Sequence, residues 1–583
     1  MTRFALDIDR SLTGRAWRWR GPEPCGASGA LIDDLLRARG CTNDTLDRER
    51  APTIRAFMPD PSVFRDMDRA AERLAAAVID RESVTIFGDY DVDGATSAAL
   101  LIRLLRDLGL DAGVYIPDRL MEGYGPSGEA LVALAQSGSS LVVTVDCGAQ
   151  AFAALEAARD AGLDVIVVDH HKCAAALPVA LALVNPNRLD ESDVGATHGH
   201  LAAVGVAFLL GAALIRTLRA RGWFDRRPEP RLMDLLDIVA LGTVADVAAI
   251  RGLNRAFVAQ GVKAMARRGN IGLNALLSVS GLERAPTCSD LGFALGPRIN
   301  AGGRVGRSDL GVRLLTTQDP EEAASIAREL NQLNSERRAI EATVQEEAER
   351  LLAEQAGRAV AVVAAPGWHP GVIGIVAGRL KEKSGLPAIV IALDETGMGK
   401  GSGRSVTGVD LGAAVLAAKD HGLLIAGGGH AMAAGLTIAS DRLAAFGEFL
   451  HERLHEDVTR AAAAKALLLD LMVAPGGLTP DLVNAMEEAG PFGNGWPAPR
   501  VALGPARGVR ADIVGTDHVR AIVSGEDGSS LKAMAFRQGQ TPLGQALLGA
   551  DPSRRFWLAG RAKIDDWGSR PAAELHVEDL APL

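Results

Sequence analysis

Three short apolar runs, each followed at once by acidic residues, constrain the fold of this chain more than any other feature. They are residues 83–87 (SVTIF), 141–145 (LVVTV) and 164–168 (DVIVV), and helical patterns such as residues 95–108 lie between them. Strands that alternate with amphipathic helices predict a parallel sheet in an α/β domain. Because ligands of such sheets bind at the carboxyl ends of the strands, the sequence predicts an acidic site at that edge.

The acidic residues after the first run form the segment GDYDVDG, residues 88–94. In an extended backbone Asp89, Asp91 and Asp93 would point the same way, and carboxylates so close repel one another unless a cation lies between them. A solvated acidic turn is the alternative interpretation. A calcium loop of the EF-hand type also begins DxDxDG, but its twelfth position requires glutamate and is Leu100 here, which excludes that loop.

The remaining acidic positions complete the predicted site. Asp146 follows the second run, Asp169, His170 and His171 follow the third, and Asp246 ends the segment GTVAD. An aspartate at a strand end or a pair of histidines can serve structure alone, whereas all of them together indicate a divalent metal site. Oxygen ligands with added imidazole favour Mn²⁺ among the hard metals. Two such ions hydrolyse phosphoesters without a protein nucleophile, so phosphoester hydrolysis is the predicted chemistry.

The 583 residues exceed what one hydrophobic core holds, since single cores stop growing near roughly 250 to 300 residues. A charge-rich helical pattern in the middle of the chain would extend roughly 50 Å at 1.5 Å per residue, and short alternating strands near the end are typical of a small barrel. The predicted divisions are an N-terminal extension (1–60), an α/β catalytic domain (61–318), a connecting helix (319–357), a smaller α/β domain (358–462) and a β-barrel (463–583).

Composition and charge limit the class of protein. The five cysteines are scattered and never spaced as CxxC, which argues against a disulfide framework or a zinc site. The longest apolar run, residues 201–215, is shorter than the ~18 residues that span a bilayer, so we expect a buried helix there. The first residues carry no apolar stretch of signal-peptide length, so we expect a cytoplasmic protein without membrane contact. A net charge of −10 still allows a locally basic groove for nucleic acid.

Nine motifs occur in a fixed order between residues 88 and 496, and by them the sequence resembles the DHH phosphoesterase family, in particular its exonucleases for single-stranded DNA. The match to these exonucleases covers almost the whole chain from about residue 60. The family takes its name from the triplet seen here at residues 169–171. The motifs are GDYDVDGATS (88–97), VDCG (145–148), VVDHH (167–171), GTVADV (242–247), GPRINAGGR (296–304), GWHPGVIGIVAGRL (367–380), GKGSGRS (399–405), GGGHAMAAG (427–435) and GPFGNGW (490–496).

The resemblance implies two Mn²⁺ ions, with Mg²⁺ as the alternative, and Asp146 as the ligand best placed to bridge them. Asp89 is expected at the edge of the site as a further ligand or a supporting acid. His171 is expected either to orient a ligand or to donate a proton to the leaving 3′ oxygen. The implied metal ligands are Asp91, Asp93, Asp146, His170 and Asp246.

The resemblance also implies residues that bind DNA. Arg119, Arg298 and Arg304 stand where the family binds DNA phosphates, and an ordinary surface arginine is the alternative interpretation of each. Ser402, Arg404 and His430 stand where a terminal phosphate or nucleotide is contacted, and the glycines beside them would let the backbone come close.

The last segment resembles an oligonucleotide-binding (OB) fold, whose groove binds a single strand through basic and stacking side chains. The aromatic candidates are equally typical of core residues. The candidates are Arg520, Lys532, Arg537, Arg561 and Lys563 for phosphates and Phe536, Trp557 and Trp567 for bases.

The function implied is a 5′-to-3′ exonuclease that releases 5′-mononucleotides from single-stranded DNA in recombination and repair. A monomer is expected, with a helicase and a single-strand-binding protein as candidate partners. One alternative is a DHH phosphodiesterase for short oligoribonucleotides or other small phosphoesters, whose members lack such a terminal barrel. Another is an inactive module that only binds DNA, which is disfavoured because every ligand position holds the expected residue type.

Overall fold

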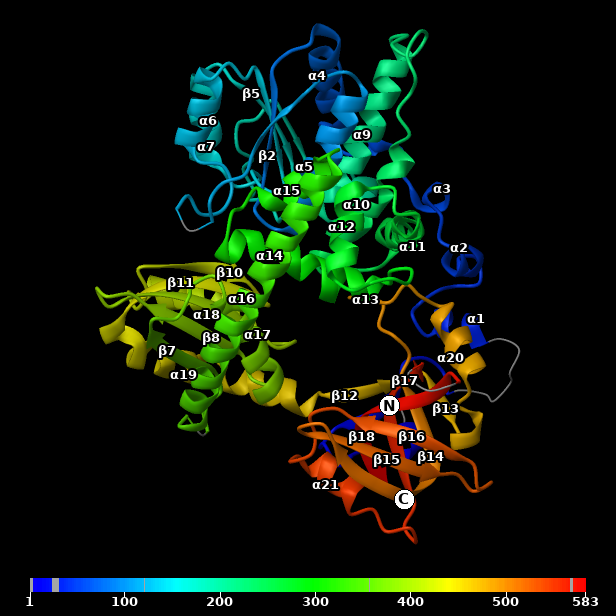
Figure 1. Ribbon diagram of the computed structural model, residues 1–583. Coiled ribbons are helices and arrows are strands. Elements are labelled where there is room, and N and C mark those ends of the chain that lie inside the picture. Colours follow the sequence, from blue (N-terminus) through cyan, green and yellow to red (C-terminus); the bar gives the residue numbers. More distant parts are fainter. Residues whose placement is uncertain (1–3, 24–30, 120, 356, 567–569) are drawn as a thin grey trace. The chain divides into compact units, whose positions relative to one another are not determined.

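The computed structural model describes residues 4–23, 31–119, 121–355, 357–566 and 570–583. The chain divides into two compact units (Figure 1). The first unit comprises residues 1–300, 308–328 and 466–583, and the second comprises residues 301–307 and 329–465.

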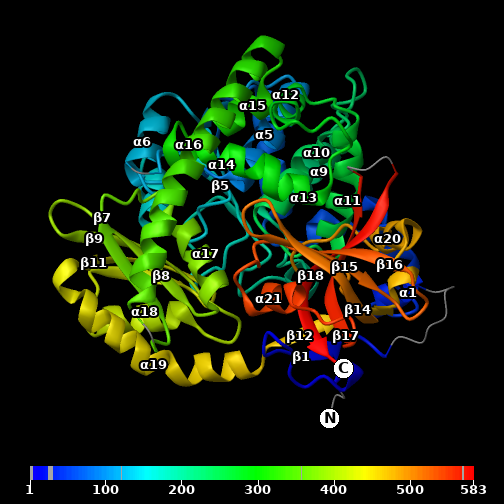
Figure 2. The same ribbon diagram turned by 60° about the horizontal axis from the view of Figure 1, so that its bottom comes forward.

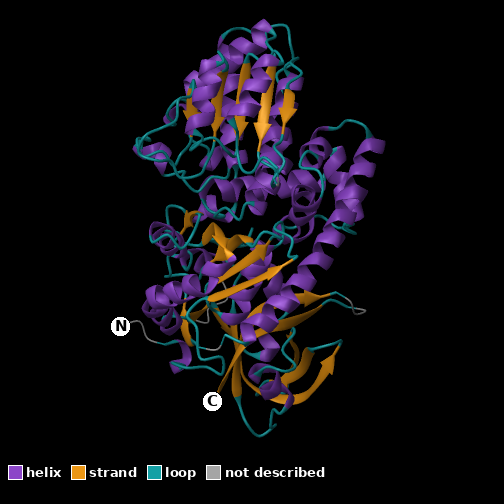
Figure 3. Cartoon of the chain, turned by 90° about the vertical axis from the view of Figure 1, so that its left-hand side faces the viewer, coloured by secondary structure: helices purple, strands orange, loops and turns teal. Residues whose placement is uncertain are grey.

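The first unit contains the parallel sheet that the sequence predicts. Its five strands lie in the order β3-β2-β4-β5-β6 with every neighbouring pair parallel, and their arrows run in one direction in Figure 3. The carboxyl ends therefore share one edge. The strands are β2 (Val84–Gly88), β3 (Gly113–Tyr115), β4 (Leu141–Val145), β5 (Asp164–Val168) and β6 (Ala182–Val184).

Helices cover both faces of this sheet. α6 and α7 pack together and bury Leu131 and Leu155 against the sheet, while α5 packs against α9 on the other face. Helix α9 is long and apolar enough to cross a membrane by composition, but 78% of it is buried in the fold, which confirms the predicted buried helix. The helices are α4 (Met67–Asp80), α5 (Val92–Asp107), α6 (Gly128–Gln136), α7 (Phe152–Asp160), α8 (Asp193–Ala196) and α9 (Ala203–Ala220).

A helical region follows the sheet, and α10 packs on both α5 and α11. Its elements are η3 (Leu232–Leu235), α10 (Leu236–Ala245), α11 (Gly252–Ala266), α12 (Ile271–Val279), α13 (Cys288–Asp290), η4 (Leu291–Leu295), α14 (Gly296–Val305) and α15 (Leu310–Thr316). The long helix α16 (Pro320–Ala353) then leads into the second unit.

The second unit is the smaller α/β domain. Its sheet has the order β10-β11-β9-β8-β7, in which β7 and β8 are parallel and the other pairs are antiparallel. Its elements are β7 (Ala361–Pro366), α17 (Ile373–Ser384), β8 (Ala388–Leu393), β9 (Met398–Arg404), α18 (Leu411–Asp420), β10 (Ala426–His430), β11 (Ala433–Ala439), η5 (Ser440–Arg442) and α19 (Leu443–Ala463).

The C-terminal strands, orange to red in Figure 2, form the predicted barrel, which closes because β14 pairs with both β15 and β17. The remaining pairs are β15 with β16, β16 with β18 and β18 with β17. Its elements are β12 (Ala466–Leu469), β13 (Leu471–Val473), η6 (Pro475–Gly477), α20 (Pro480–Glu487), β14 (Val501–Val514), β15 (His518–Ser524), β16 (Ser530–Ala535), α21 (Pro542–Leu548), β17 (Phe556–Asp565) and β18 (Ala572–Pro582).

The N-terminal segment packs on the barrel. Strand β1 (Ala16–Trp19) pairs in parallel with β12. Trp17 is fully buried, and its indole N–H donates to Asp579 Oδ2 at 3.0 Å. Trp17 and Ala5 thus form a buried cluster with residues of β12 and of the barrel strands, separate from the main barrel core. The other elements of the extension are η1 (Ala5–Asp7), α1 (Leu31–Arg37), α2 (Leu46–Arg50), α3 (Ile54–Phe57) and η2 (Pro61–Val63).

Candidate active site

The aspartates after β2 lie where the strand ends and helix α5 begins. Asp91 is the N-cap of α5, and its Oδ1 accepts hydrogen bonds from the backbone N–H groups of Asp93 at 2.9 Å and Gly94 at 3.1 Å. The expectation of an extended backbone through all three aspartates is therefore wrong, because Asp93 already lies in the first turn. Gly94 permits this path, since a Cβ there would lie 2.4 Å from Asp89 O.

Asp93 joins the start of α5 to the start of α9. Its carboxylate accepts hydrogen bonds from the backbone N–H groups of Ala203 at 2.6 Å and Val204 at 2.9 Å, and the residue is 1% exposed. Burial, followed by the charge of Asp91, raises the pKa of Asp93 to about 7. Each carboxylate oxygen keeps a second lone pair, so this contact leaves Asp93 able to bind a cation.

Asp146 and Asp169 follow neighbouring strands, but their carboxylates have different partners. Asp146 has a left-handed backbone, with φ of 62°, and its carboxylate meets the two histidines. Asp169 instead accepts hydrogen bonds from the backbone N–H of Ala149 and from Nδ1 of His171. Burial alone would raise the pKa of Asp169, but these bonds and the charges of the histidines outweigh it and lower the pKa to about 2.

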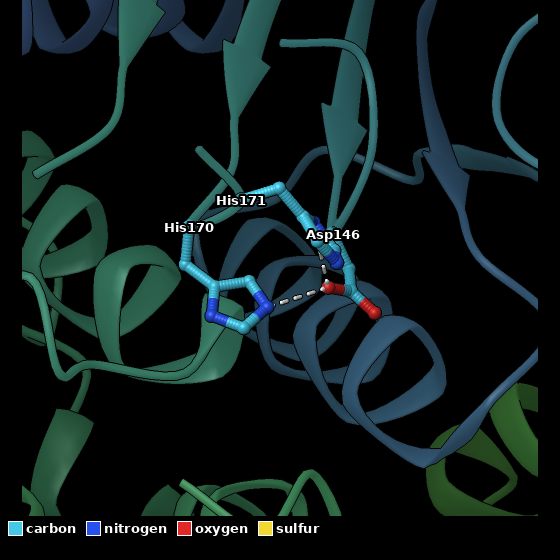
Figure 4. A group of neighbouring side chains, drawn as sticks. All are labelled: Asp146, His170 and His171. Atoms are coloured by element: carbon cyan, nitrogen blue, oxygen red, sulfur yellow. Dashed lines mark ion pairs between the residues drawn. The ribbon is translucent and has the colours of Figure 1, made fainter. Parts of the chain in front are cut away.

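His170 has the geometry of a metal ligand. Its Nδ1 donates to the carbonyl oxygen of Leu201 at 3.1 Å, which leaves the Nε2 lone pair facing Asp146 Oδ1 at 3.3 Å. Both imidazoles turn toward the Asp146 carboxylate (Figure 4). Burial, followed by the charge of His171, lowers the pKa of His170 to about 4, so the ring is held in the neutral form that binds metals.

The structure brings together all seven side chains that the sequence singled out as metal ligands or catalytic residues. They form three overlapping sets whose possible ligand atoms lie within 4.8 Å of one another. Asp146 belongs to two sets and His170 to two. The sets are Asp89, Asp91 and Asp146; Asp93, His170 and Asp246; and Asp146, His170 and His171.

Two observations show that these residues suit divalent cations. Asp89 Oδ1, Asp146 Oδ1 and His170 Nε2 are buried, and none has a hydrogen-bond partner within the described part of the chain. Burial, followed by the charges of neighbouring aspartates, also raises the pKa values of Asp89, Asp146 and Asp246 well above the usual range. Buried acceptors without partners and mutually repelling carboxylates are both stabilised by bound cations.

Tyr124 is a neighbour of the site that the sequence did not reveal. Its hydroxyl donates to the carbonyl oxygen of Asp146 at 2.9 Å and lies 3.2 Å from Nδ1 of His171. It thereby supports the left-handed backbone of Asp146. Because tyrosine is seldom a ligand of hard metals, the only signal available was its place in MEGYG, close to Arg119.

The three predicted arginines have different surroundings. The Arg119 guanidinium lies 4.8 Å from the centroid of the Tyr90 ring, beside the aspartates. Arg298 donates to the carbonyl oxygen of Ala294 at 2.7 Å in the first unit. Arg304 donates to that of Gly371 at 2.9 Å in the second unit. These contacts orient the three guanidinium groups.

Ser402, Arg404 and His430 lie on one face of the second sheet. Arg404 of β9 is paired with Ala433 of β11, and Ala433 is paired with His430 of β10. Arg404, Ala433 and His430 therefore form a row across the sheet. Ser402 is two residues before Arg404 on β9 and therefore points to the same face. Beside Ser402, a Cβ added to Gly428 or Gly435 would meet nothing within 4 Å, which leaves the surface open.

The glycines of GKGSGRS serve packing, contrary to the expectation that they let a ligand approach. A Cβ on Gly399, Gly401 or Gly403 would lie 2.6–2.7 Å from side chains of the apolar core. These glycines alternate with Lys400, Ser402 and Arg404 and so lie on the opposite, covered face. The open positions of the predicted substrate surface are in β10 and β11 instead.

Most predicted barrel cations are paired with carboxylates. Phe536 is 46% exposed and lies edge-on to His518 and His576, so it is available for stacking, whereas Trp557 packs partly into the core. Trp567 lies outside the described residues. The ion pairs are Arg520 with Asp512, Lys532 with Asp565 and Glu574, Arg561 with Glu578, and Lys563 with Glu487.

Comparison with known proteins agrees with this architecture. The chain matches the family models of the DHH family N-terminal domain at residues 83–243, the DHHA1 domain at residues 357–456 and the RecJ OB domain at residues 469–579. The parallel sheet with its acidic edge is thus that of a DHH phosphoesterase, joined to a DHHA1 domain and an OB barrel.

Individual relatives define the family further. The single-stranded-DNA-specific exonuclease RecJ of Dickeya dadantii is 38% identical over 95% of this chain and 96% of its own length. That of Escherichia coli is 36% identical over the same shares. RecJ of Thermus thermophilus in complex with Mn²⁺ superimposes with a TM-score of 0.75 at 28% identity, over 97% of this chain and 79% of that one. The chain belongs to the RecJ family of single-stranded-DNA-specific exonucleases.

Proposed function

We propose that this chain is a metal-dependent exonuclease that degrades single-stranded DNA from the 5′ end and releases 5′-mononucleotides. The observation that carries the proposal is the meeting of five aspartates and two histidines at one sheet edge, where buried polar atoms lack protein partners. The RecJ relatives named for single-stranded DNA support the substrate. These relatives come from bacteria, which supports action on DNA in the cytoplasm. The proposed role is recombination and repair of that DNA.

The proposed metals are two Mn²⁺ ions, or Mg²⁺, and Asp146 would contribute to both sites. The overlap of the ligand sets at Asp146 supports this, as do relatives crystallised with Mn²⁺ and with Mg²⁺. When bound, such ions lower the pKa of water and stabilise charge on the phosphate. The ligands are Asp91, Asp93, Asp146, His170 and Asp246, with Asp89 completing the set at its edge.

His171 is the proposed proton donor to the leaving 3′ oxygen. Its Nδ1 is engaged by Asp169, which leaves Nε2 as the nitrogen that can reach substrate. Burial would lower the pKa of His171, but the Asp169 hydrogen bond and the charges of Asp169, Asp93 and Asp91 raise it above the usual value. A raised pKa keeps the proton on the ring near neutral pH, as a general acid requires.

Six side chains are the proposed DNA contacts. Arg119 lies beside the proposed metal-binding aspartates, and Ser402, Arg404 and His430 share one face of the second sheet. Guanidinium groups bind phosphate oxygens in pairs, so arginine is suited to hold the scissile and neighbouring phosphates. Arg298 and Arg304 are included because they occupy the matching positions of the family motif.

The test of this activity uses single-stranded oligonucleotides labelled at the 5′ or the 3′ end, with Mn²⁺ or Mg²⁺. Release of 5′-labelled mononucleotide at the first time point would support the polarity, whereas early loss of the 3′ label would refute it. Asp146→Ala should abolish cleavage and retain single-strand binding. The exposed Asp111→Ala is the matched control and should cleave like the wild type. Equal rates for both variants would remove the assigned site.

The ion-paired barrel cations give weight to the alternative that short phosphoesters are the substrates. Removing the barrel is a poor test, because it would expose Trp17, and β1 would lose its partner strand. Phe536→Ala with Arg537→Ala is cleaner. A DNA exonuclease should lose affinity for a long single strand and keep its rate on a dinucleotide, whereas unchanged long-strand affinity would favour the alternative.

The family further makes a monomer the proposed state and a helicase and a single-strand-binding protein the proposed partners. Light scattering tests the first proposal, and a dimer at micromolar concentration would contradict it. The proposal of partners is tested by adding a helicase or a single-strand-binding protein and measuring whether the rate of digestion rises.

A further inference from the structure

The glycine-rich turn before the barrel lies against the segment that follows Asp246. The side-chain amide of Asn494 donates to the carbonyl oxygen of Val247 at 2.7 Å. The backbone carbonyl of the same Asn494 accepts from the N–H of Ile250, also at 2.7 Å. A single asparagine thus holds both ends of the short segment between Asp246 and helix α11.

This segment contains a strained residue next to a proposed metal ligand. Val247 has a φ of 59°, in the left-handed region, and its side chain is 64% exposed. A β-branched residue rarely adopts that conformation, because its side chain then crowds the backbone. Exposure means that packing of the Val247 side chain does not compensate. The Asn494 hydrogen bond to its carbonyl is a direct restraint on this conformation.

The turn that carries Asn494 is itself firmly held. Backbone hydrogen bonds join Gly493 and Trp496 in both directions, at 2.9 and 3.1 Å. The Trp496 indole donates to Ala489 O, and the fully buried Arg255 guanidinium lies 4.2 Å from the Trp496 ring centroid. Arg255 belongs to α11, so the turn is anchored to the helix that follows the strained segment.

The glycines of the turn allow this close packing. A Cβ on Gly493 would lie 2.8 Å from Ile250 Cγ1, and one on Gly495 would lie 3.2 Å from the Cβ of Ala249. Gly495 also has a φ of 71°, which disfavours other residues. The turn backbone therefore packs directly on the side chains of Ala249 and Ile250, so a displacement of the turn would also move these two residues.

We propose that Asn494 is a positioning residue for Asp246, so that the segment leading into the barrel sets the affinity of the metal site. The inference rests on the proposed role of Asp246 as a ligand. Asp246 is the C-cap of helix α10, where its backbone N–H donates to Gly242 O at 2.9 Å, and Val247 follows it in the left-handed conformation. The N–H groups of Val247 and Ala248 hold this turn from the helix side, and Asn494 holds it from the opposite side. Without the Asn494 restraint the strained turn relaxes and displaces the last turn of α10, and with it the Asp246 carboxylate.

The test measures Mn²⁺ binding to the intact protein by electron paramagnetic resonance of free Mn²⁺, without DNA. Asn494→Ala should weaken Mn²⁺ binding about tenfold, in the range seen when groups that orient ligands are removed. Exonuclease activity should return toward the wild-type rate at saturating Mn²⁺. The matched control is Asn484→Ala, an exposed asparagine of α20, which should bind Mn²⁺ like the wild type. Asn494→Asp, which keeps the shape but loses the donor, serves if the alanine variant does not fold.

A second background separates positioning from general stability. Asparagine adopts the left-handed conformation more readily than valine, so Val247→Asn should make the segment less dependent on Asn494. In that background Asn494→Ala should weaken Mn²⁺ binding by no more than about threefold. Unchanged Mn²⁺ affinity of Asn494→Ala, or an equal loss in both backgrounds, would overturn the proposal. If Asp246→Ala itself bound Mn²⁺ normally, the proposed ligand would be wrong instead.

Discussion

Oδ1 of Asp169 lies 2.8 Å from Nδ1 of His171, and the same oxygen accepts the backbone N–H groups of His170 and His171. The first residue of the DHH triplet thus holds the two histidines in place, and it belongs to none of the three candidate metal sets. An ionised Asp169 fixes the tautomer of His171 and stabilises its protonated form.

Replacing Asp169 by asparagine tests this relationship. Asp169→Asn removes the negative charge that raises the pKa of His171, so that pKa should fall. A general acid with a lower pKa loses its proton at lower pH, and the alkaline decline of the rate should therefore move to lower pH. We expect roughly 100-fold slower turnover at pH 8. The pH profile of kcat checks this, with Asp111→Asn as control, and an unshifted alkaline limb would contradict it.

The buried carboxylates predict a pH dependence of the metal-free protein. The folded-state pKa of Asp93 is about 7, above the ordinary aspartate value, so the folded state holds more protons than the unfolded state between these values. Stability without metal should therefore fall as pH rises toward about 7 and then level off. Because Mn²⁺ competes with these protons, the stabilisation by Mn²⁺ should grow over the same range.

Thermal unfolding between pH 5 and 8.5, in EDTA or in Mn²⁺, measures both trends. Asp146→Asn removes one of the repelling charges, so it should raise Tm in EDTA at pH 8 and reduce the shift produced by Mn²⁺. A Mn²⁺ shift that shrinks as pH rises would show that these carboxylates are not the binding groups.

Two glycines in neighbouring strands of the second sheet should respond differently to the same methyl group. A Cβ on Gly403 would lie 2.7 Å from Leu411 Cδ2, whereas one on Gly435 meets nothing within 4 Å. Gly403→Ala should therefore destabilise the protein by about 1–3 kcal/mol through overpacking. Gly435→Ala should leave Tm unchanged and weaken DNA binding, because its methyl group would occupy the open surface beside Ser402. Equal effects on Tm would contradict the assignment of the two faces.

The parallel sheet and its acidic edge were predictable because both depend on local pattern. The three strands that carry the acidic residues show as β-branched runs, whereas the short edge strands β3 and β6 do not and were not predicted. Parallel strands necessarily end at the same edge. The position where α5 begins was not anticipated, although an aspartate is a favoured N-cap and Asp91 serves as one. The expectation of an extended segment was based on the spacing of the aspartates, and this N-cap preference was not considered.

Tertiary relationships account for what the sequence did not reveal. Tyr124 and Asn494 have side chains typical of many loops, and only the fold brings Tyr124 to Asp146 and Asn494 to Val247, the neighbour of Asp246. The parallel pairing of β1 with β12 joins positions about 450 residues apart along the chain, for which no periodicity exists. Strand β14 could not be predicted as one strand, because it contains Gly504 and Pro505, both of which ordinarily interrupt strands.

The barrel arginines predict how DNA binding should depend on salt. Each phosphate neutralised on a single strand contributes about −0.7 to the slope of log affinity against log salt concentration. Arg561 is paired with Glu578 at 3.0 Å, whereas Arg537 is exposed and has no carboxylate partner among the described residues. Arg537→Ala should therefore reduce the magnitude of the slope by about 0.7, and Arg561→Ala by much less. Fluorescence anisotropy with a labelled single strand at several salt concentrations gives both slopes. An equal change for Arg561→Ala and Arg537→Ala would contradict this prediction. It would mean that the Arg561–Glu578 ion pair opens when DNA binds, so that Arg561 also contacts a phosphate.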